Sequence, residues 1–255
     1  MLYASAACAV SIGKIRGNNE DNLYFNGFIL PQENTGHEQI MTCEGTLRIP
    51  VCYGVFDGMG GEARGEEASY IAAKMLKEIA EKNGAGMETV LRAIEKANSA
   101  ICEAADWHRE GLMGSTLVTL CVDFKDAHIC NLGDSRAYLL RREKLRQISE
   151  DHTDWALLEA CGIKNRRPRL TQHLGIPPTE LMLQPYCASL AIQPGDRFLL
   201  CSDGLTDMVQ TIELEQIMRV GSDASSIVSI LMRAALQNGG RDNITIIVCE
   251  ITEQD

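Results

Sequence analysis

The stretch VCYGVFDG, residues 51–58, is an apolar run that ends in an aspartate-glycine pair. Two later runs have the same form, ICNLGD (129–134) and RFLLCSDG (197–204), while DNITIIV (242–248) begins with its aspartate. Short apolar runs bounded by turn residues are typical of buried β-strands. The sequence therefore predicts four strands that each carry an aspartate at one end.

Strand patterns occur in blocks along the rest of the chain, and helical patterns separate the blocks. Strands are expected at Leu2–Gly13, Leu23–Ile29, Gln39–Arg48, Val51–Phe56, Ser115–Asp123, Ala127–Leu132, Arg136–Leu140, Lys144–Ile148, Leu181–Leu190, Arg197–Cys201 and Asn243–Ile251. Helical spacing of apolar residues covers 68–80, 87–101 and 227–235, and Asp154–Cys161 fits a short helix. This order favours an α+β fold, in which two mainly antiparallel sheets pack face to face with helix pairs on their outer sides.

No repeat or linker divides the 255 residues, so we expect one catalytic domain over 1–255 with a basic flap at about 150–178. The formal charge of −11 argues against binding to nucleic acid or to an anionic membrane. No apolar run approaches the ~18 residues of a membrane span. The nearest cysteines, such as Cys121 and Cys130, are nine positions apart, and most of the ten lie in apolar runs. We expect reduced core cysteines in a cytoplasmic, monomeric protein.

The aspartates at the strand ends invite two interpretations. Taken alone, the pair Asp57-Gly58 or Asp203-Gly204 is more often an ordinary turn than part of a functional site. Together, carboxylates within ~5 Å of one another would repel by about 3 kcal/mol a pair at an effective dielectric near 20. Hard divalent cations would relieve that repulsion, and a site of oxygen ligands without nearby His or Cys suits Mg²⁺ or Mn²⁺. Cations in such a site also activate water for hydrolysis.

Six short blocks then resemble the metal-dependent serine/threonine protein phosphatases of the 2C type, in the family's order and in the form of its bacterial branch. They are RGNNED (16–21), VFDGMGG (55–61), GST (114–116), GDSR (133–136), SDGL (202–205) and RDNIT (241–245). The resemblance implies a four-layer αββα sandwich with a metal centre at one end. It implies hydrolysis of phosphoserine and phosphothreonine in proteins phosphorylated by a Ser/Thr kinase, through direct attack by a hydroxide that bridges two cations.

The resemblance also implies roles for individual residues. Two Mn²⁺ or Mg²⁺ ions would be tightly bound, with Asp57 bridging them, the Gly58 carbonyl on one, and Asp203 and Asp242 on the other. Glu20 and Asp21 would hold metal-bound waters or ligate weakly. Asp134 and Asp207 would join Asp203 at a third, looser cation, and Arg16 would bind the substrate phosphate with its two-pronged guanidinium.

Some relatives carry a histidine directly after the Asp-Gly pair, where this chain has Met59. A metal-bound water is therefore expected to protonate the leaving group. His152 and His173 are other candidates, although a structural role suits each better.

Two alternatives remain open from the sequence. Cys130-Asn-Leu-Gly-Asp-Ser-Arg136 fits the C-x₂-G-x₂-R pattern of cysteine-dependent phosphatases, in which a thiolate attacks phosphate in a backbone cradle. Ile129 before the cysteine, Asp134 inside the loop and a strand-like continuation oppose this interpretation. The other alternative is a catalytically inactive relative that serves as a binding module, and it would be expected to lack one of the metal aspartates.

Overall fold

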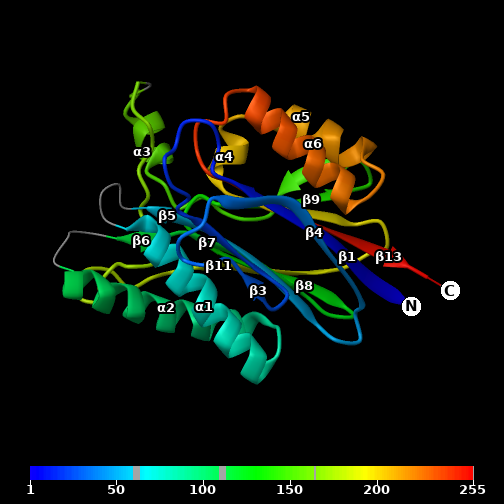
Figure 1. Cartoon of the computed structure of the whole chain (residues 1–255), viewed down its shortest axis with the longest axis horizontal. Helices are drawn as coiled ribbons and strands as arrows, with labels where there is room; N and C mark the ends of the chain where they lie inside the picture. Colours follow the sequence, from blue (N-terminus) through cyan, green and yellow to red (C-terminus); the bar gives the residue numbers. More distant parts are fainter. Residues whose placement is uncertain (60–63, 109–112, 164, 255) are drawn as a thin grey trace.

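Two antiparallel sheets pack face to face in the computed structural model, which describes residues 1–59, 64–108, 113–163 and 165–254 (Figure 1). The first sheet has the strand order β10-β9-β12-β13-β1-β4, and the second has the order β11-β8-β7-β5-β2-β3, with β6 paired to β5. The first consists of β1 (Leu2–Ser11), β4 (Gly36–Thr46), β9 (Arg136–Arg141), β10 (Lys144–Gln147), β12 (Arg197–Cys201) and β13 (Ile244–Glu253). The second consists of β2 (Asp21–Phe25), β3 (Phe28–Ile29), β5 (Val51–Met59), β6 (Gly114–Ser115), β7 (Leu117–Val122), β8 (Asp126–Leu132) and β11 (Tyr186–Ala191).

A pair of helices covers the outer face of each sheet (Figure 1). Helices α1 (Gly65–Asn83) and α2 (Met87–His108) lie on the second sheet, and α5 (Thr211–Val220) and α6 (Ala224–Gln237) lie on the first. The short helices α3 (Trp155–Ala160) and α4 (Asp203–Thr206) lie at one end of the sandwich. The predicted α+β fold of four αββα layers is confirmed.

The alternation of strand side chains builds three apolar layers. In β5, Tyr53 and Val55 point into the core between the sheets, whereas Cys52 and Phe56 point toward α1 and α2. All four side chains are at most 1% exposed. Since successive strand residues face opposite sides, a strand covered on both faces must be apolar throughout. This requirement explains why VCYGVF is a continuous apolar run.

Three predicted strands need correction. The expected strand Leu23–Ile29 is a hairpin of β2 and β3, because Asn26 and Gly27 adopt φ values of 45° and 106° and turn the chain. The expected strand Ser115–Asp123 is divided into β6 and β7. Of Leu181–Leu190, only the second part forms β11.

Helix α5 was missed because its pattern is blurred. Ile212 and Val220 are 73% and 77% exposed, so apolar residues lie on both faces of this helix. The described part of the predicted flap contains α3 and otherwise irregular chain, joined by a bridge between Thr153 and Leu170. Among the described residues, no helix has both the length and the apolar composition needed to cross a membrane.

Candidate active site

The predicted aspartates meet at one end of the sandwich, and they come from both sheets. Asp57 near the end of β5 lies directly opposite Asp21 at the start of β2, in the second sheet. Asp203 follows β12 and Asp242 precedes β13, and these two strands pair in the first sheet. Asp134 lies in the connection from β8 to β9, which crosses between the sheets. The site therefore needs the strands of both sheets.

Mutual repulsion shows how close these carboxyls lie. Burial raises the pKa of Asp57 well above its usual range, and the carboxylates of Asp21, Asp203, Asp134 and Asp242 raise it further. The pKa of Asp203 rises to about 7, first through burial and then through repulsion by other carboxylates of the cluster. The group thus concentrates negative charge that the protein only partly neutralises.

Asp21 is positioned by the opposite sheet. Its Oδ2 atom accepts hydrogen bonds from Thr245 Oγ1 at 2.6 Å and from Ser202 Oγ at 2.8 Å. Its Oδ1 atom is buried and has no partner among the described residues. Burial raises the pKa of this carboxyl to about 7, although the two hydroxyl groups oppose the shift. A buried carboxylate oxygen without a partner is costly, so Oδ1 is suited to a ligand that the protein itself does not supply.

The segment that carries Glu20 is fixed by Asn243. The backbone N–H of Glu20 donates to Asn243 Oδ1 at 2.8 Å, and Asn243 Nδ2 donates to the carbonyls of Ile12 and Asn18, each at 3.0 Å. Burial raises the pKa of Glu20. Asn243 lies directly after Asp242, so the same short segment holds both the Glu20 backbone and a predicted metal ligand.

Gly58 lies where three backbone segments approach one another. Its N–H donates to the Glu20 carbonyl at 3.1 Å. A Cβ atom at this position would lie 2.1 Å from the Gly65 carbonyl oxygen and 2.5 Å from that of Glu20. Only glycine fits at this position, and its lack of a side chain lets β5, the start of α1 and the Glu20 backbone approach one another closely. The next residues of the VFDGMGG block, Gly60 and Gly61, lie outside the described residues.

Arginines contact the carboxylates at two places. Arg16 Nη2 lies 2.8 Å from Asp242 Oδ2. Arg167 Nη2 lies 2.6 Å from Asp203 Oδ2 and 3.2 Å from Asp207 Oδ2. Attraction by Asp203 raises the pKa of Arg167, which the sequence analysis did not include in the site. The basic run RRPR at 166–169 was the available signal. Arg136, by contrast, pairs with Asp151 at 2.6 Å.

The donor atoms at this end suit hard cations. Within the described chain, no three His, Cys, Asp or Glu side chains are already arranged around one metal position. Arg16 and Arg167 instead contact carboxylates that the sequence analysis expected on metals. The donors are carboxylates and the Gly58 carbonyl, and oxygen donors of this kind favour Mg²⁺ or Mn²⁺. The unpartnered Oδ1 of Asp21 and the raised pKa values of Asp57 and Asp203 indicate that positive charge would stabilise the cluster.

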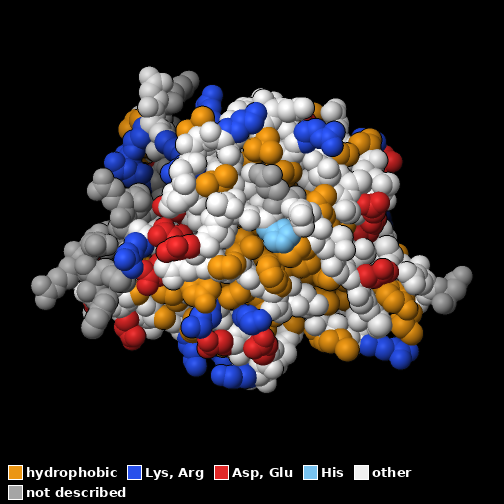
Figure 2. Space-filling view, viewed as in Figure 1, with side chains coloured by type: hydrophobic (Ala, Val, Ile, Leu, Met, Phe, Trp, Pro, Cys, Tyr) orange, Lys and Arg blue, Asp and Glu red, His pale blue; other side chains and the backbone are white. Residues whose placement is uncertain are grey.

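A pocket of about 490 Å³ opens beside the cluster. Asp134, Asp203 and Asp207, the three residues expected at a looser cation, line it together with Arg167. At the same end of the molecule, on the left of Figure 2, acidic side chains gather beside basic ones. The pocket gives a substrate or an ion a path to Asp203.

The side chains of both candidate histidines form hydrogen bonds with backbone groups. The N–H of Gly133 donates to His152 Nδ1 at 3.2 Å, and the N–H of His152 donates to the Gly133 carbonyl at 3.0 Å. His173 Nδ1 donates to the Leu174 carbonyl at 2.9 Å. Both contacts are structural, and His152 in particular shapes the turn that presents Asp134. Met59 ends β5 opposite Gly114.

The cysteine-dependent alternative is wrong. Cys130 lies within β8, 1% exposed, instead of in a loop at a helix N-terminus. A hydrogen bond to Cys187 and burial both raise its pKa, so the thiol is not activated. Arg136 of the pattern lies on β9 and pairs with Asp151.

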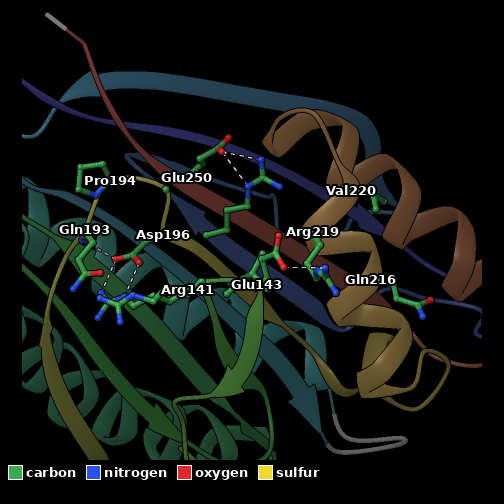
Figure 3. Close-up of a pocket in the computed structure, with 13 residues that line it drawn as sticks. Arg141, Glu143, Gln193, Pro194, Asp196, Gln216, Arg219, Val220 and Glu250 are labelled. Atoms are coloured by element: carbon green, nitrogen blue, oxygen red, sulfur yellow. Dashed lines mark hydrogen bonds and ion pairs between the residues drawn. The ribbon is translucent and has the colours of Figure 1, made fainter.

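A larger pocket of about 790 Å³ lies at the opposite end of the same strands. Figure 3 shows Arg141 facing Asp196 and Arg219 facing Glu143. Arg197, which also lines this pocket, pairs with Glu250 at 2.9 Å. These pairs neutralise one another, whereas the carboxylates at the other end are only partly neutralised. Charge, and not volume, therefore identifies the candidate site.

Comparisons with known proteins identify the family of this chain. Residues 44–239 match the family described as Protein phosphatase 2C. This chain belongs to the protein phosphatase 2C family. The serine/threonine phosphatase stp of Listeria monocytogenes is 33% identical over 93% of this chain and 92% of its own length. PstP of Mycobacterium tuberculosis is 30% identical over 95% of this chain, which spans 44% of that longer protein.

Solved structures of phosphatases have the same fold. The crystal structure of Mycobacterium tuberculosis PstP superposes with a TM-score of 0.79 at 26% identity, over 98% of this chain and all of that one. The crystal structure of the catalytic domain of a serine/threonine protein phosphatase PstP in complex with two manganese ions gives a TM-score of 0.78 at 27% identity, over 99% of this chain and all of that one. The resemblance found in the six sequence blocks, and the enzyme class that it implied, are thus confirmed.

Proposed function

We propose that this protein phosphatase 2C family member hydrolyses phosphoserine and phosphothreonine in proteins, using two or three Mn²⁺ or Mg²⁺ ions. The observation that carries the proposal is the convergence of Asp21, Asp57, Asp134, Asp203 and Asp242 at one end of the sandwich. Burial, and then repulsion by neighbouring carboxylates, raises the pKa values of Asp21, Asp57 and Asp203 there. The phosphatase relatives and the manganese complex of the PstP catalytic domain support it.

The residues present fit defined roles at this cluster. Asp57 would hold two cations, with the Gly58 carbonyl on one side and Asp203 and Asp242 on the other. Glu20 and Asp21 would hold waters of the site, and Asp134, Asp203 and Asp207 would hold a third ion beside the pocket. When bound, such cations lower the pKa of water and neutralise phosphate oxygens. The cations therefore supply both the nucleophile and the charge compensation for direct hydrolysis.

Arginine and polar side chains complete the site. Arg16 is 43% exposed beside Asp242, so its guanidinium can turn to bind two phosphate oxygens of a substrate. Thr245 and Ser202 hold Asp21 in one orientation, and Asn243 fixes Glu20. With methionine at position 59 and both candidate histidines bonded to backbone, the proton for the leaving serine or threonine is assigned to a water of the site.

The test is hydrolysis of a phosphothreonine peptide with Mn²⁺ and with EDTA. Wild type should turn over only with the cation, and Asp57→Asn and Asp203→Asn should lose turnover while keeping a normal circular dichroism spectrum. Asp126→Asn is the matched control, because Asp126 lies in the β7–β8 hairpin and contacts Lys125. Activity of Asp57→Asn near that of wild type would refute the assignment. A folded wild type without turnover in either condition would instead favour the inactive binding module.

The biological setting is proposed on more general grounds. We infer that the substrates are products of a Ser/Thr kinase and that the enzyme acts in signalling as a cytoplasmic monomer. Its ten cysteines, all of them free, fit a reducing compartment. The whole of residues 1–255 would form one catalytic domain, with the flap at about 150–178 placing Arg167 beside the metal-binding carboxylates.

A further inference from the structure

Two cysteines face each other across neighbouring strands of the second sheet. Cys130 on β8 lies directly opposite Cys187 on β11 in an antiparallel pair. Their Sγ atoms are 2.9 Å apart. Opposite residues of antiparallel strands have Cα atoms about 4.5–5.5 Å apart, which lies inside the range of about 4.4–6.8 Å that a disulfide spans. The backbone thus already has a spacing that a disulfide requires.

The two thiols differ in access. Cys187 is exposed on β11, an edge strand of its sheet, whereas Cys130 is 1% exposed. The expectation of reduced core cysteines therefore does not describe Cys187. We propose that Cys130 and Cys187 form an oxidant-sensitive dithiol, which hydrogen peroxide converts into a disulfide between β8 and β11.

The chemistry divides between the two sulfurs. A hydrogen bond from Cys130 lowers the pKa of Cys187 and raises that of Cys130, so Cys187 is the thiol that ionises first. Its thiolate attacks one oxygen of hydrogen peroxide, the O–O bond breaks, and hydroxide leaves and takes up a proton, which gives a sulfenic acid and water. The Cys130 sulfur then attacks the Cys187 sulfur, the S–O bond breaks, and the proton of Cys130 leaves with hydroxide as a second water. Two thiols are oxidised, and one peroxide is reduced.

A second pair of facing cysteines has a similar spacing, but both of its thiols are buried. Cys52 on β5 lies directly opposite Cys121 on β7, and their Sγ atoms are 2.7 Å apart. Both are 1% exposed in the apolar layer under α1 and α2. Hydrogen peroxide can reach Cys187 from solvent but can reach this inner pair only if the layer opens. The proposal therefore predicts oxidation of one pair and protection of the other.

Cys161 is a control with the opposite combination, because it is exposed to solvent but has no facing thiol among the described residues. Cys161 is exposed after α3, and none of the close thiol pairs in the described chain includes it. Peroxide should convert it to a sulfenic acid without forming an intramolecular disulfide. A disulfide at Cys187 and none at Cys161 would show that the facing Cys130 decides the product.

The experiment is peptide mapping of the full chain in EDTA after brief treatment with a few-fold excess of hydrogen peroxide. Remaining thiols are alkylated, and the protein is digested without reductant and analysed by mass spectrometry. The expected result is a linked peptide that contains Cys130 and Cys187, lacks two hydrogen atoms, and separates with dithiothreitol. Cys52 and Cys121 should be recovered as alkylated thiols once the protein is denatured.

Two variants sharpen the test. Cys187→Ser should abolish the linked peptide and leave Cys130 as a free thiol, and Cys161→Ser should leave the linked peptide at its wild-type yield. The proposal is overturned if wild type gives Cys187 as sulfinic or sulfonic acid with Cys130 unlinked. It is equally overturned if Cys52–Cys121 is the linked pair. Because the wild-type map is decisive, the conclusion does not depend on the folding of either variant.

Discussion

The carboxylate cluster should make the metal-free protein more stable in mild acid than at neutral pH. The pKa values of Asp21 and Asp203 rise from 3.8 to about 7 in the folded chain. The folded state therefore binds protons more tightly than the unfolded state. The stability that these carboxyls contribute is fully present below the unfolded pKa, and it is lost as the pH rises through the folded pKa.

The magnitude follows from the shift. With a folded pKa of about 7, each carboxyl adds about 2 kcal/mol more stability at about pH 5.5 than at about pH 7.5. If the two share a single proton, the total stays near ~2 kcal/mol. For a chain of this length, each kcal/mol moves the melting temperature by about 2–4 °C. In EDTA, the Tm should then be roughly 4–8 °C higher at the lower pH.

The assay is thermal unfolding followed by circular dichroism in EDTA across this pH range. Asp21→Asn removes one of the two carboxyls that retain protons, so the rise in Tm on acidification should shrink. Excess Mn²⁺ should raise the Tm most at neutral pH, where the carboxylates are charged, since a ligand of the native state alone stabilises it. The two proteins differ only at position 21, so the difference between wild type and variant isolates the cluster.

Asp223→Asn is the control. Asp223 caps α6 and has a lowered pKa, so it stays charged throughout this range, and asparagine caps a helix about as well. This variant should keep the wild-type dependence on pH. An equal slope in wild type and Asp21→Asn would refute the argument, because the carboxyls would then not be close enough to retain protons.

Three further predictions concern single side chains. Thr245→Val removes the hydroxyl that donates to Asp21 and should lower stability by about 1–3 kcal/mol in urea unfolding, a loss that Thr252→Val at the other end of β13 should not show. Arg167→Ala frees the carboxylates of Asp203 and Asp207 and should tighten Mn²⁺ binding measured by calorimetry. Arg166→Ala removes only a contact with Asp154 and should leave the Mn²⁺ affinity unchanged. An unchanged affinity in Arg167→Ala would contradict the idea that Arg167 and Mn²⁺ compete for these oxygens. Gly58→Ala places Cβ 2.1 Å from a backbone oxygen and should destabilise the fold by about 3 kcal/mol or more, whereas Gly17→Ala, with open space around it, should be neutral in the same melting experiment.

Much of the fold could be predicted from local patterns. The continuous apolar run at 51–56 predicts a strand covered on both faces, and β5 is buried on both faces. The pattern failed where tertiary contacts override it. Asn26-Gly27 lies inside a run that looks like one strand, and only pairing of β2 with β3 shows that the chain turns there. Helix α5 has apolar residues on its exposed side, so its period is blurred.

The acidic residues of the site could also be predicted, because aspartate next to apolar runs is conspicuous and the six blocks resemble one family. Arg167 could not be assigned, since the basic flap has no periodic pattern that fixes which arginine reaches the carboxylates. Thr245 and Ser202 were missed as well. Their hydroxyls gain a role only because β12 and β13 bring them to Asp21 from the other sheet.

The amino-acid sequence by itself determined where most strands form, which carboxylates stand at their ends, and to which family the chain belongs, because these depend on residue type and short-range order. Tertiary structure alone decided that both sheets deliver those carboxylates to one place, that Arg167 contacts them, and that Cys187 faces Cys130. The physical reason is that strand pairing joins residues far apart in the chain, and proximity then sets the pKa values and hydrogen bonds on which the chemistry depends.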